Sequence, residues 1–175
     1  MNTVVVSVAD CQVSNDQEAL LVTYALGSCI GLVVYDPIAR VGGMLHYMLP
    51  ESHIDRAKAE ANPYMFADTG IPLLFKRTYQ YGAQKGRMLV WAAGGAQPLQ
   101  ESGIFDIGKR NQLALRKILW RAGVMLSSEE VGGSHPRTMR LGMETGQCWL
   151  REGNAEREMA VHGRRKEVGS CLTAS

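Results

Sequence analysis

The amino-acid sequence predicts a single α+β domain in which helices cover the faces of β-sheets. Segments that favour strands outnumber those that favour helices, two helical segments are clear, and no internal repeat or linker divides the chain. The length of 175 residues is that of one domain and is sufficient to bury a hydrophobic core. Hydrophobic residues make up 46% and charged residues 21% of the chain, which is ordinary for a soluble globular protein.

In the first third of the chain, β-branched and aromatic residues gather in short runs, which is typical of strands. We expect strands at residues 3–10, 20–25, 30–37 and 41–50. The polar segment 11–19 predicts a loop after the first strand. Asp36-Pro37 and Pro50 should end the third and fourth strands, because proline cannot donate to a strand ladder.

Two segments have the pattern of helices. The first extends from Pro63 to Tyr81, because Asn62 is a capping residue and proline is favoured at the first helical position. Pro72 within it predicts a kink or a later start. The second helix, residues 106–122, has an apolar face at helical spacing, made of Leu115, Ile118, Leu119 and Ala122. Gly123 is a natural C-terminal stop.

Four more strands are expected at residues 86–96, 124–130, 137–144 and 147–152, with a tight turn at Thr145-Gly146 before the last. After Gly153 the chain becomes polar and charged. We therefore divide it into a folded domain, residues 1–153, and a polar C-terminal extension, residues 154–175, which is partly ordered or mobile.

Charge and segment patterns exclude several classes of protein. The net charge of +2 gives no strong field for nucleic acid or for an anionic membrane. No apolar run approaches the roughly 18–20 residues of a membrane span, and the first residues, MNTVVVSVAD, do not resemble a signal peptide. The four cysteines form no CxxC pair, so we expect no metal site. We expect no organic cofactor either. We expect a cytoplasmic protein with reduced thiols.

The segment TYALGSCIGLVVYDP places Cys29 directly after Gly27-Ser28 and before a strand. Glycine allows a sharp turn and a close approach of substrate to the backbone. The amides of Ser28 and Cys29 could then stabilise an oxyanion. A cysteine nucleophile needs a base. His46 is the best candidate, because it lies in a predicted neighbouring strand, residues 41–50.

A third group usually orients a histidine base, and Thr23 and Ser28 are both nearby hydroxyl candidates between which the pattern does not choose. The same residues also have a purely structural interpretation. A single cysteine before an apolar strand is more often a small core residue, and a single histidine in MLHYML is more often half-buried with a satisfied hydrogen bond.

Six segments occur together in the chain: TYALGSCIGLVVYD, GGMLHYMLP, FADTGIPLLF, WAAGGAQ, IGKRNQLALRKIL and VGGSHPRTMRLGMETG. Their combination, over residues 3–150, resembles the CheD family of chemoreceptor glutamine deamidases. The resemblance implies an α/β sandwich, with sheets flanked by helices, similar to bacterial toxin cysteine deamidases. The sequence departs from the family pattern at Pro136-Arg137, where the family usually has a Gly-Arg pair.

The resemblance implies that Cys29 is the nucleophile, His46 the base and Thr23 the residue that orients the imidazole. The implied substrate is a glutamine on the cytoplasmic helices of a chemoreceptor, which is converted to glutamate through a thioester. Some family members also bind CheC, a phosphatase of the chemotaxis response regulator. Two alternatives therefore accompany the deamidase hypothesis: a binding module that docks on a CheC-type phosphatase, and a receptor methylesterase that uses the same two residues.

Overall fold

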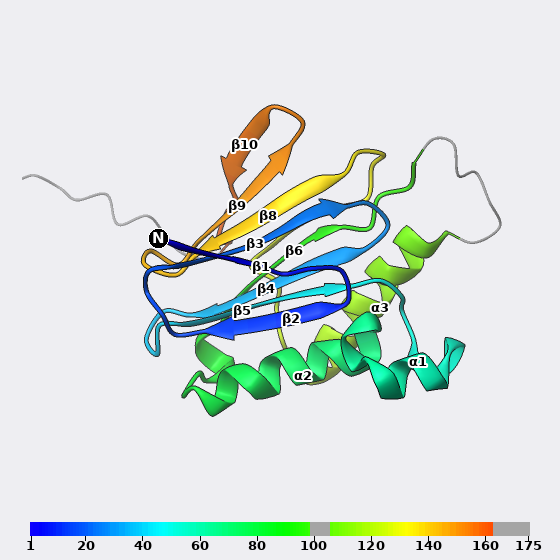
Figure 1. The fold of residues 1–175 in the computed structure, drawn as a ribbon, viewed down its shortest axis with the longest axis horizontal. Helices are drawn as coiled ribbons and strands as arrows, with labels where there is room; N and C mark the ends of the chain where they lie inside the picture. The colour runs from blue at the N-terminus through cyan, green and yellow to red at the C-terminus, as the bar shows by residue number, and fades with distance from the viewer. Residues whose placement is uncertain (99–105, 163–175) are drawn as a thin grey trace, which may run out of the picture.

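A computed structural model of the protein describes residues 1–98 and 106–162. In these residues two five-stranded sheets stack face to face, and helices cover the outer face of the second (Figure 1). Sheet A contains, in spatial order, β1 (Asn2–Val5), β3 (Ala19–Leu26), β8 (Arg137–Gly142), β9 (Gln147–Glu152) and β10 (Ala155–Glu158). Sheet B contains β2 (Asp10–Ser14), β5 (Val41–Tyr47), β4 (Ile30–Asp36), β6 (Leu89–Gly94) and β7 (Ser128–Val131).

The helices of this described part are α1 (Arg56–Ala61), α2 (Ala67–Gln80) and α3 (Ile107–Ala122), with 3₁₀ turns η1 (Ser52–Ile54), η2 (Pro63–Met65) and η3 (Lys85–Arg87). The ends of α3 confirm the sequence prediction: the Asp106 carboxylate accepts from the Lys109 amide, and Gly123 adopts the left-handed conformation. None of these helices is long and apolar enough to cross a bilayer.

Two hydrophobic cores lie on the two sides of sheet B. The inter-sheet core fills the space between the sheets and includes Leu21, Leu26, Val33, Met44, Trp91 and Met139. The helix-side core lies under α2 and α3 and includes Leu32, Leu45, Ile71, Leu74 and Leu115. Every residue of β4 and β5 is therefore buried, which explains why these strands are largely apolar and do not alternate between polar and apolar residues. The single α+β domain predicted from sequence is confirmed, with the helices confined to one face.

The prediction of a loop over residues 11–19 is wrong in its first part, because β2 forms there and pairs antiparallel with β5. The single strand expected at 3–10 is instead split, and the chain passes from sheet A to sheet B at Ala9, whose φ is 57°. β2 is an edge strand in which Cys11 is buried and the other residues, mostly polar, are only partly buried. A short strand composed mostly of polar residues looks like a loop in the sequence.

The first helix begins later than its capping pattern indicates. Asn62 caps only the 3₁₀ turn that starts at Pro63, and α2 begins at Ala67. Pro72 then lies inside α2, where it removes one helical hydrogen bond, and the later start of the two sequence alternatives is the one observed. After β10 the chain remains packed: Met159 is buried, its amide donates to the Cys148 carbonyl, and the Trp91 indole donates to the Ala160 carbonyl.

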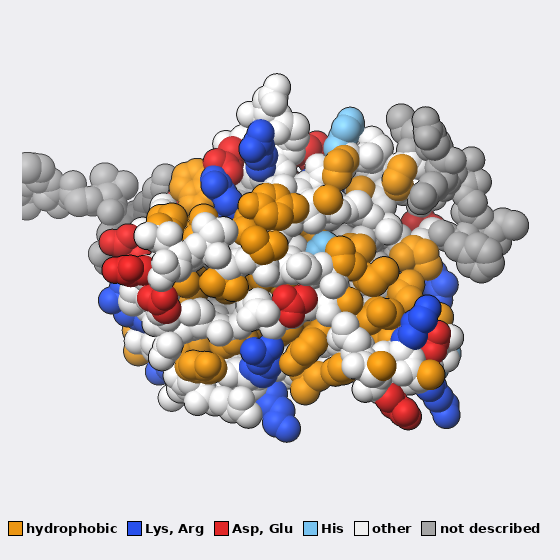
Figure 2. All heavy atoms as spheres, viewed as in Figure 1, with side chains coloured by type: hydrophobic (Ala, Val, Ile, Leu, Met, Phe, Trp, Pro, Cys, Tyr) orange, Lys and Arg blue, Asp and Glu red, His pale blue; other side chains and the backbone are white. Residues whose placement is uncertain are grey.

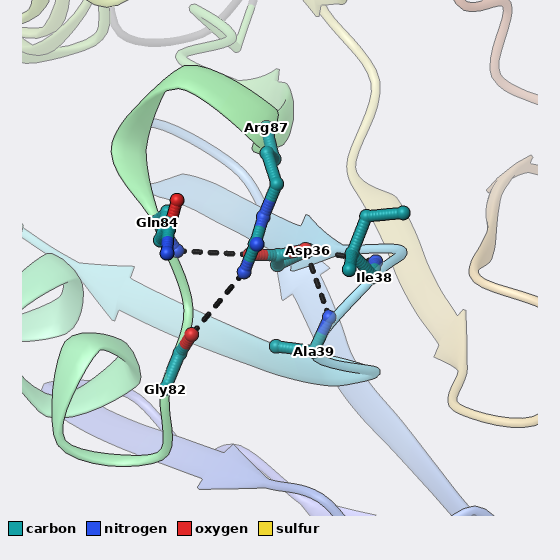
Figure 3. Close-up of polar contacts among 6 residues, drawn as sticks. All are labelled: Asp36, Ile38, Ala39, Gly82, Gln84 and Arg87. Atoms are coloured by element: carbon teal, nitrogen blue, oxygen red, sulfur yellow. Dashed lines mark hydrogen bonds and ion pairs between the residues drawn. The ribbon is translucent and has the colours of Figure 1, made fainter.

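The carboxylate of Asp36 joins the end of β4 to the segment between α2 and β6 (Figure 3). It is fully buried and accepts from the amides of Ile38, Ala39 and Gln84 and, in two bonds of 2.7 and 2.9 Å, from the Arg87 guanidinium. Burial opposes ionisation, but the hydrogen bonds outweigh it and lower the pKa of Asp36. The β4–β5 turn is thus held to the helix layer by a charged group.

Replacing Asp36 with Asn should lower the free energy of unfolding by about 3 kcal/mol, because it leaves Arg87 without its buried partner. Since the pKa of Asp36 is lowered, its contribution is complete above the unfolded-state value of about 4 and is lost as the pH falls through the folded-state value. Urea unfolding at several pH values measures both effects.

The matched control is Glu129→Gln, which removes the partly exposed ion pair between Arg116 and Glu129 and should cost less than about 1 kcal/mol. Equal losses in the two variants would contradict the structural role of Asp36.

Candidate active site

The chain crosses from sheet A to sheet B in the turn between β3 and β4, and Cys29 is the last residue of that turn. The pairing of β3 with β8 shifts in register between Thr23 and Leu26, and Ala25 there has a φ of 55°. This bulge bends the strand out of sheet A. Cys29 is consequently half-buried at the edge of the inter-sheet core, which it contacts.

The turn is held against the end of β6 through its carbonyl groups. The carbonyl of Gly27 accepts from the Ala96 amide and that of Cys29 from the Gly95 amide, each at 2.8 Å. A Cβ atom on Gly94, whose φ is 106°, would lie 2.2 Å from the Cys29 carbonyl oxygen. Only glycine allows this approach, so the glycine pair at the end of β6, Gly94-Gly95, determines where the backbone of Cys29 lies.

The side chain of His46 crosses the inter-sheet space to sheet A. His46 lies in β5 and pairs with Gly31 of β4, and its Nδ1 is 2.8 Å from the hydroxyl of Thr23 in β3. Cys29 precedes Gly31 by two residues, so the register makes Cys29 the diagonal neighbour of His46 on the inter-sheet face. Diagonal neighbours are about 7–8 Å apart, a distance that a long side chain such as that of histidine can span.

The Thr23 hydroxyl determines the tautomer of the imidazole. It donates its single hydrogen to the Val6 carbonyl at 2.7 Å, so towards His46 it can only accept. Nδ1 of the ring must therefore carry the proton, and the lone pair is on Nε2. Nε2 is buried and has no hydrogen-bond partner among the described residues. The ring is thus held with its basic nitrogen free.

Burial keeps both groups of the pair neutral. It raises the pKa of the Cys29 thiol, an effect that the residue's own amide partly opposes, and it lowers the pKa of His46 to about 4. Within residues 1–98 and 106–162 no hydrogen bond joins the sulfur to the ring. Hydrogen bonds between catalytic groups often tighten only when substrate binds. The geometry supplies a thiol, a neutral base and a group that orients the base.

The backbone around Ser28 has donors that no other described residue uses. The Ser28 amide donates to no other described residue, and the partner of the Cys29 amide is that residue's own sulfur. The Ser28 side chain was the second candidate for orienting His46, but the hydroxyl that contacts the ring is that of Thr23. No group of three metal-binding side chains occurs in the described part of the chain.

Sequence reasoning missed Asn111, whose side chain contacts this site. It lies in α3, is fully buried, and donates to the Ser28 and Met48 carbonyls at 2.9 and 2.8 Å. The available signal was its position four residues before Leu115, which places an amide on the apolar face of the predicted helix. A polar residue at such a position needs a specific partner.

Replacing Thr23 with Val should release the imidazole, since it leaves Nδ1–H without an acceptor. We expect ¹⁵N NMR of the wild type to show a neutral Nδ1–H tautomer that protonates only near pH 4, and the variant to show mixed tautomers. Thr78→Val is the control, because it also removes a buried hydroxyl but one that bonds within α2. A wild-type ring that titrates at its ordinary pKa would contradict the assignment.

Comparison with known proteins identifies relatives over most of the chain. The family model described as CheD chemotactic sensory transduction matches residues 48–152. A probable chemoreceptor glutamine deamidase CheD of Solibacter usitatus is 55% identical over 159 residues, covering 91% of this chain and 94% of the relative. A probable CheD of Syntrophus aciditrophicus is 49% identical over 91% of this chain and 100% of the relative.

A third relative, a probable chemoreceptor glutamine deamidase CheD of Anaeromyxobacter dehalogenans, is 47% identical over 88% of this chain and 97% of its own length. The family model begins after Thr23, Cys29 and His46, but an alignment over 91% of the chain must include the segment that contains them. The coverage is nearly complete in both directions. This chain belongs to the CheD family.

Proposed function

We propose that the protein is a protein-glutamine deamidase that converts selected glutamines on chemoreceptor cytoplasmic helices to glutamate. In this proposal Cys29 is the nucleophile, His46 is the general base and acid, and Thr23 orients His46. The relatives in the CheD family are named as probable chemoreceptor glutamine deamidases. The observation that supports the assignment of residues is the hydrogen bond between Thr23 and His46, because it leaves Nε2 unprotonated on a residue whose strand register makes Cys29 its diagonal neighbour.

The first half of the reaction forms a thioester. Nε2 of His46 takes the thiol proton as the sulfur attacks the carboxamide carbon of the glutamine. The amides of Ser28 and Cys29 stabilise the oxyanion of the tetrahedral intermediate. The imidazolium then gives its proton to the amide nitrogen, the carbon–nitrogen bond breaks, and ammonia leaves.

The second half regenerates the thiol. His46, again neutral, takes a proton from a water molecule as the water oxygen attacks the thioester carbonyl. The carbon–sulfur bond breaks, the sulfur regains its proton from the imidazolium, and glutamate is released. The net reaction consumes one water and releases one ammonia for each glutamine. The product adds a negative charge to the receptor helix, which can shift a signalling equilibrium.

The proposal extends to location and partner. A thiol nucleophile must remain reduced, which favours the cytoplasm, where the substrate helices are expected. Docking on a CheC-type phosphatase remains the second candidate role. Figure 2 shows acidic, basic and apolar side chains interspersed over the face it presents, which is ordinary for a soluble protein and does not favour nucleic acid.

Incubation with a chemoreceptor cytoplasmic fragment should raise the fragment mass by about 1 Da per converted glutamine, as amide hydrolysis requires. Cys29→Ala should abolish the gain, because no other group replaces the sulfur. Cys11→Ala is the control, since it removes a thiol that is buried in the helix-side core and should retain activity.

Full activity in Cys29→Ala would refute the nucleophile. Release of methanol from a methylated receptor fragment, without any mass gain at glutamine, would instead identify a methylesterase. Binding of a CheC-type phosphatase without either reaction would leave only the docking role.

The pH profile of kcat/KM tests the neutral pair. His46 accepts a proton only while it is neutral, and burial lowers its pKa to about 4. The thiol keeps its proton until alkaline pH, because burial raises its pKa. We therefore expect kcat/KM to fall below about pH 5, where His46 becomes protonated, and to stay nearly constant through neutral pH until the thiol ionises at alkaline pH. An acid limb centred at the ordinary histidine value of about 6.5 would contradict the proposal.

A further inference from the structure

The side chain of Asn111 connects the turn that carries Cys29 to the strand that carries His46. Its Nδ2 donates to the carbonyl of Ser28, the residue before the proposed nucleophile, at 2.9 Å. The same nitrogen donates to the carbonyl of Met48, two residues after the proposed base, at 2.8 Å. One amide group of α3 therefore fixes the ends of two strands relative to each other.

The orientation of this amide follows from its partners. Both partners are carbonyl oxygens, which only accept, so the NH₂ group must face them and both of its hydrogens are used. The remaining oxygen, Oδ1, is buried and has no hydrogen-bond partner among the described residues. An unpaired buried carbonyl lowers stability. Asn111 thus makes its two hydrogen bonds while its unpaired oxygen lowers the stability of the folded protein. Such a loss of stability is common at functional sites.

Asn111 lies where the strand pairing of β4 with β5 ends. The last pair of the ladder is Ile30 with Tyr47, and one step further the register would place Cys29 opposite Met48. The Met48 amide instead donates to the carbonyl of Met65. Since the ladder does not continue, the spacing between the two chain segments at the site is set by the bridging amide.

The position of Asn111 is itself fixed by contacts between its own helix, α3, and the neighbouring segments. Its main-chain carbonyl accepts from the Tyr47 hydroxyl at 2.8 Å. The adjacent Gln112 donates to the Gly95 carbonyl, and the Gly95 amide in turn donates to the Cys29 carbonyl. A Cβ on Gly108 would lie 2.6 Å from the Ala96 carbonyl, so the helix packs directly against this loop. The first half of α3 is a rigid support for the site.

We propose that Asn111 is a positioning residue for the reaction. It holds the Cys29 turn at the separation from the His46 strand at which the neutral imidazole accepts the thiol proton. This inference rests on the proposed pairing of Cys29 with His46 as nucleophile and base. Because a displacement of about 1 Å can reduce a rate about 100-fold, a residue that never touches substrate can control the chemical step.

The test replaces Asn111 with Leu, which fills a similar volume but cannot donate. Two measurements are made on the full chain: kcat and KM for a receptor fragment, and the rate at which iodoacetamide alkylates Cys29, followed by mass spectrometry from pH 5 to pH 10. Transfer of the thiol proton to His46 produces a small population of thiolate that does not vary with pH between the two pKa values. In the wild type this thiolate population should add a pH-independent component to the rate of alkylation.

Asn111→Leu should remove this component, leaving only the rate that rises with thiol ionisation, and should lower kcat about 100-fold with little change in KM. Leu115→Ala is the matched control, because Leu115 is one turn further along α3, is fully buried and contacts neither carbonyl. It should lower the melting temperature at least as much and yet retain the pH-independent component. If Asn111→Leu does not fold, Asn111→Ser, too short to reach both carbonyls, replaces it.

An unchanged alkylation profile and kcat in the Asn111 variant, or loss of the component in Leu115→Ala as well, would overturn the inference. The alkylation measurement distinguishes failure of this inference from failure of the proposed deamidase function. A wild-type protein that shows the pH-independent component but converts no glutamine would refute the deamidase activity and leave the role of Asn111 intact.

Discussion

The hydroxyl of Thr23 is the link on which the proposed chemistry depends. It lies between the backbone carbonyl of Val6, the residue after β1, and an imidazole that extends from the other sheet. Its single hydrogen is committed to Val6, so the ring nitrogen that faces it must be the donor. The reactive form of His46 is therefore determined by the stacking of two sheets, and the inter-sheet core maintains it by holding Thr23 and His46 at hydrogen-bonding distance.

A hydroxyl in this position has a different electrostatic effect from a carboxylate. It orients the imidazole without adding negative charge, so nothing offsets the desolvation that lowers the pKa of His46. The thiol is also neutral, because its pKa is raised. Proton transfer from Cys29 to His46 thus accompanies the attack on substrate, and its efficiency depends on their separation more than on a pre-formed ion pair.

The helix layer contributes to this separation from the opposite side of sheet B. β4 is fixed at both of its ends: Asp36 joins one end to the segment after α2, and the turn with Cys29 is held at the other end by α3 and the glycine pair at the end of β6. Because both faces of β4 are buried, the strand has little freedom to shift between these two attachments. The position of the nucleophile is therefore a property of all three layers.

The sequence by itself determined the fold class, the long helix with its caps, and the strands at residues 30–37 and 41–50, because periodicity, capping and strand propensity depend on neighbours along the chain. It also singled out Cys29 and His46, although their catalytic roles stay a prediction. It missed β2, whose pairing with β5 is long-range, and it left the choice between Thr23 and Ser28 open to the resemblance. Only the tertiary structure decided which hydroxyl meets the imidazole, which tautomer results, and that Asn111 bridges the two strand ends. Each of these depends on distances between layers, and residues far apart in the chain carry no local pattern that records them.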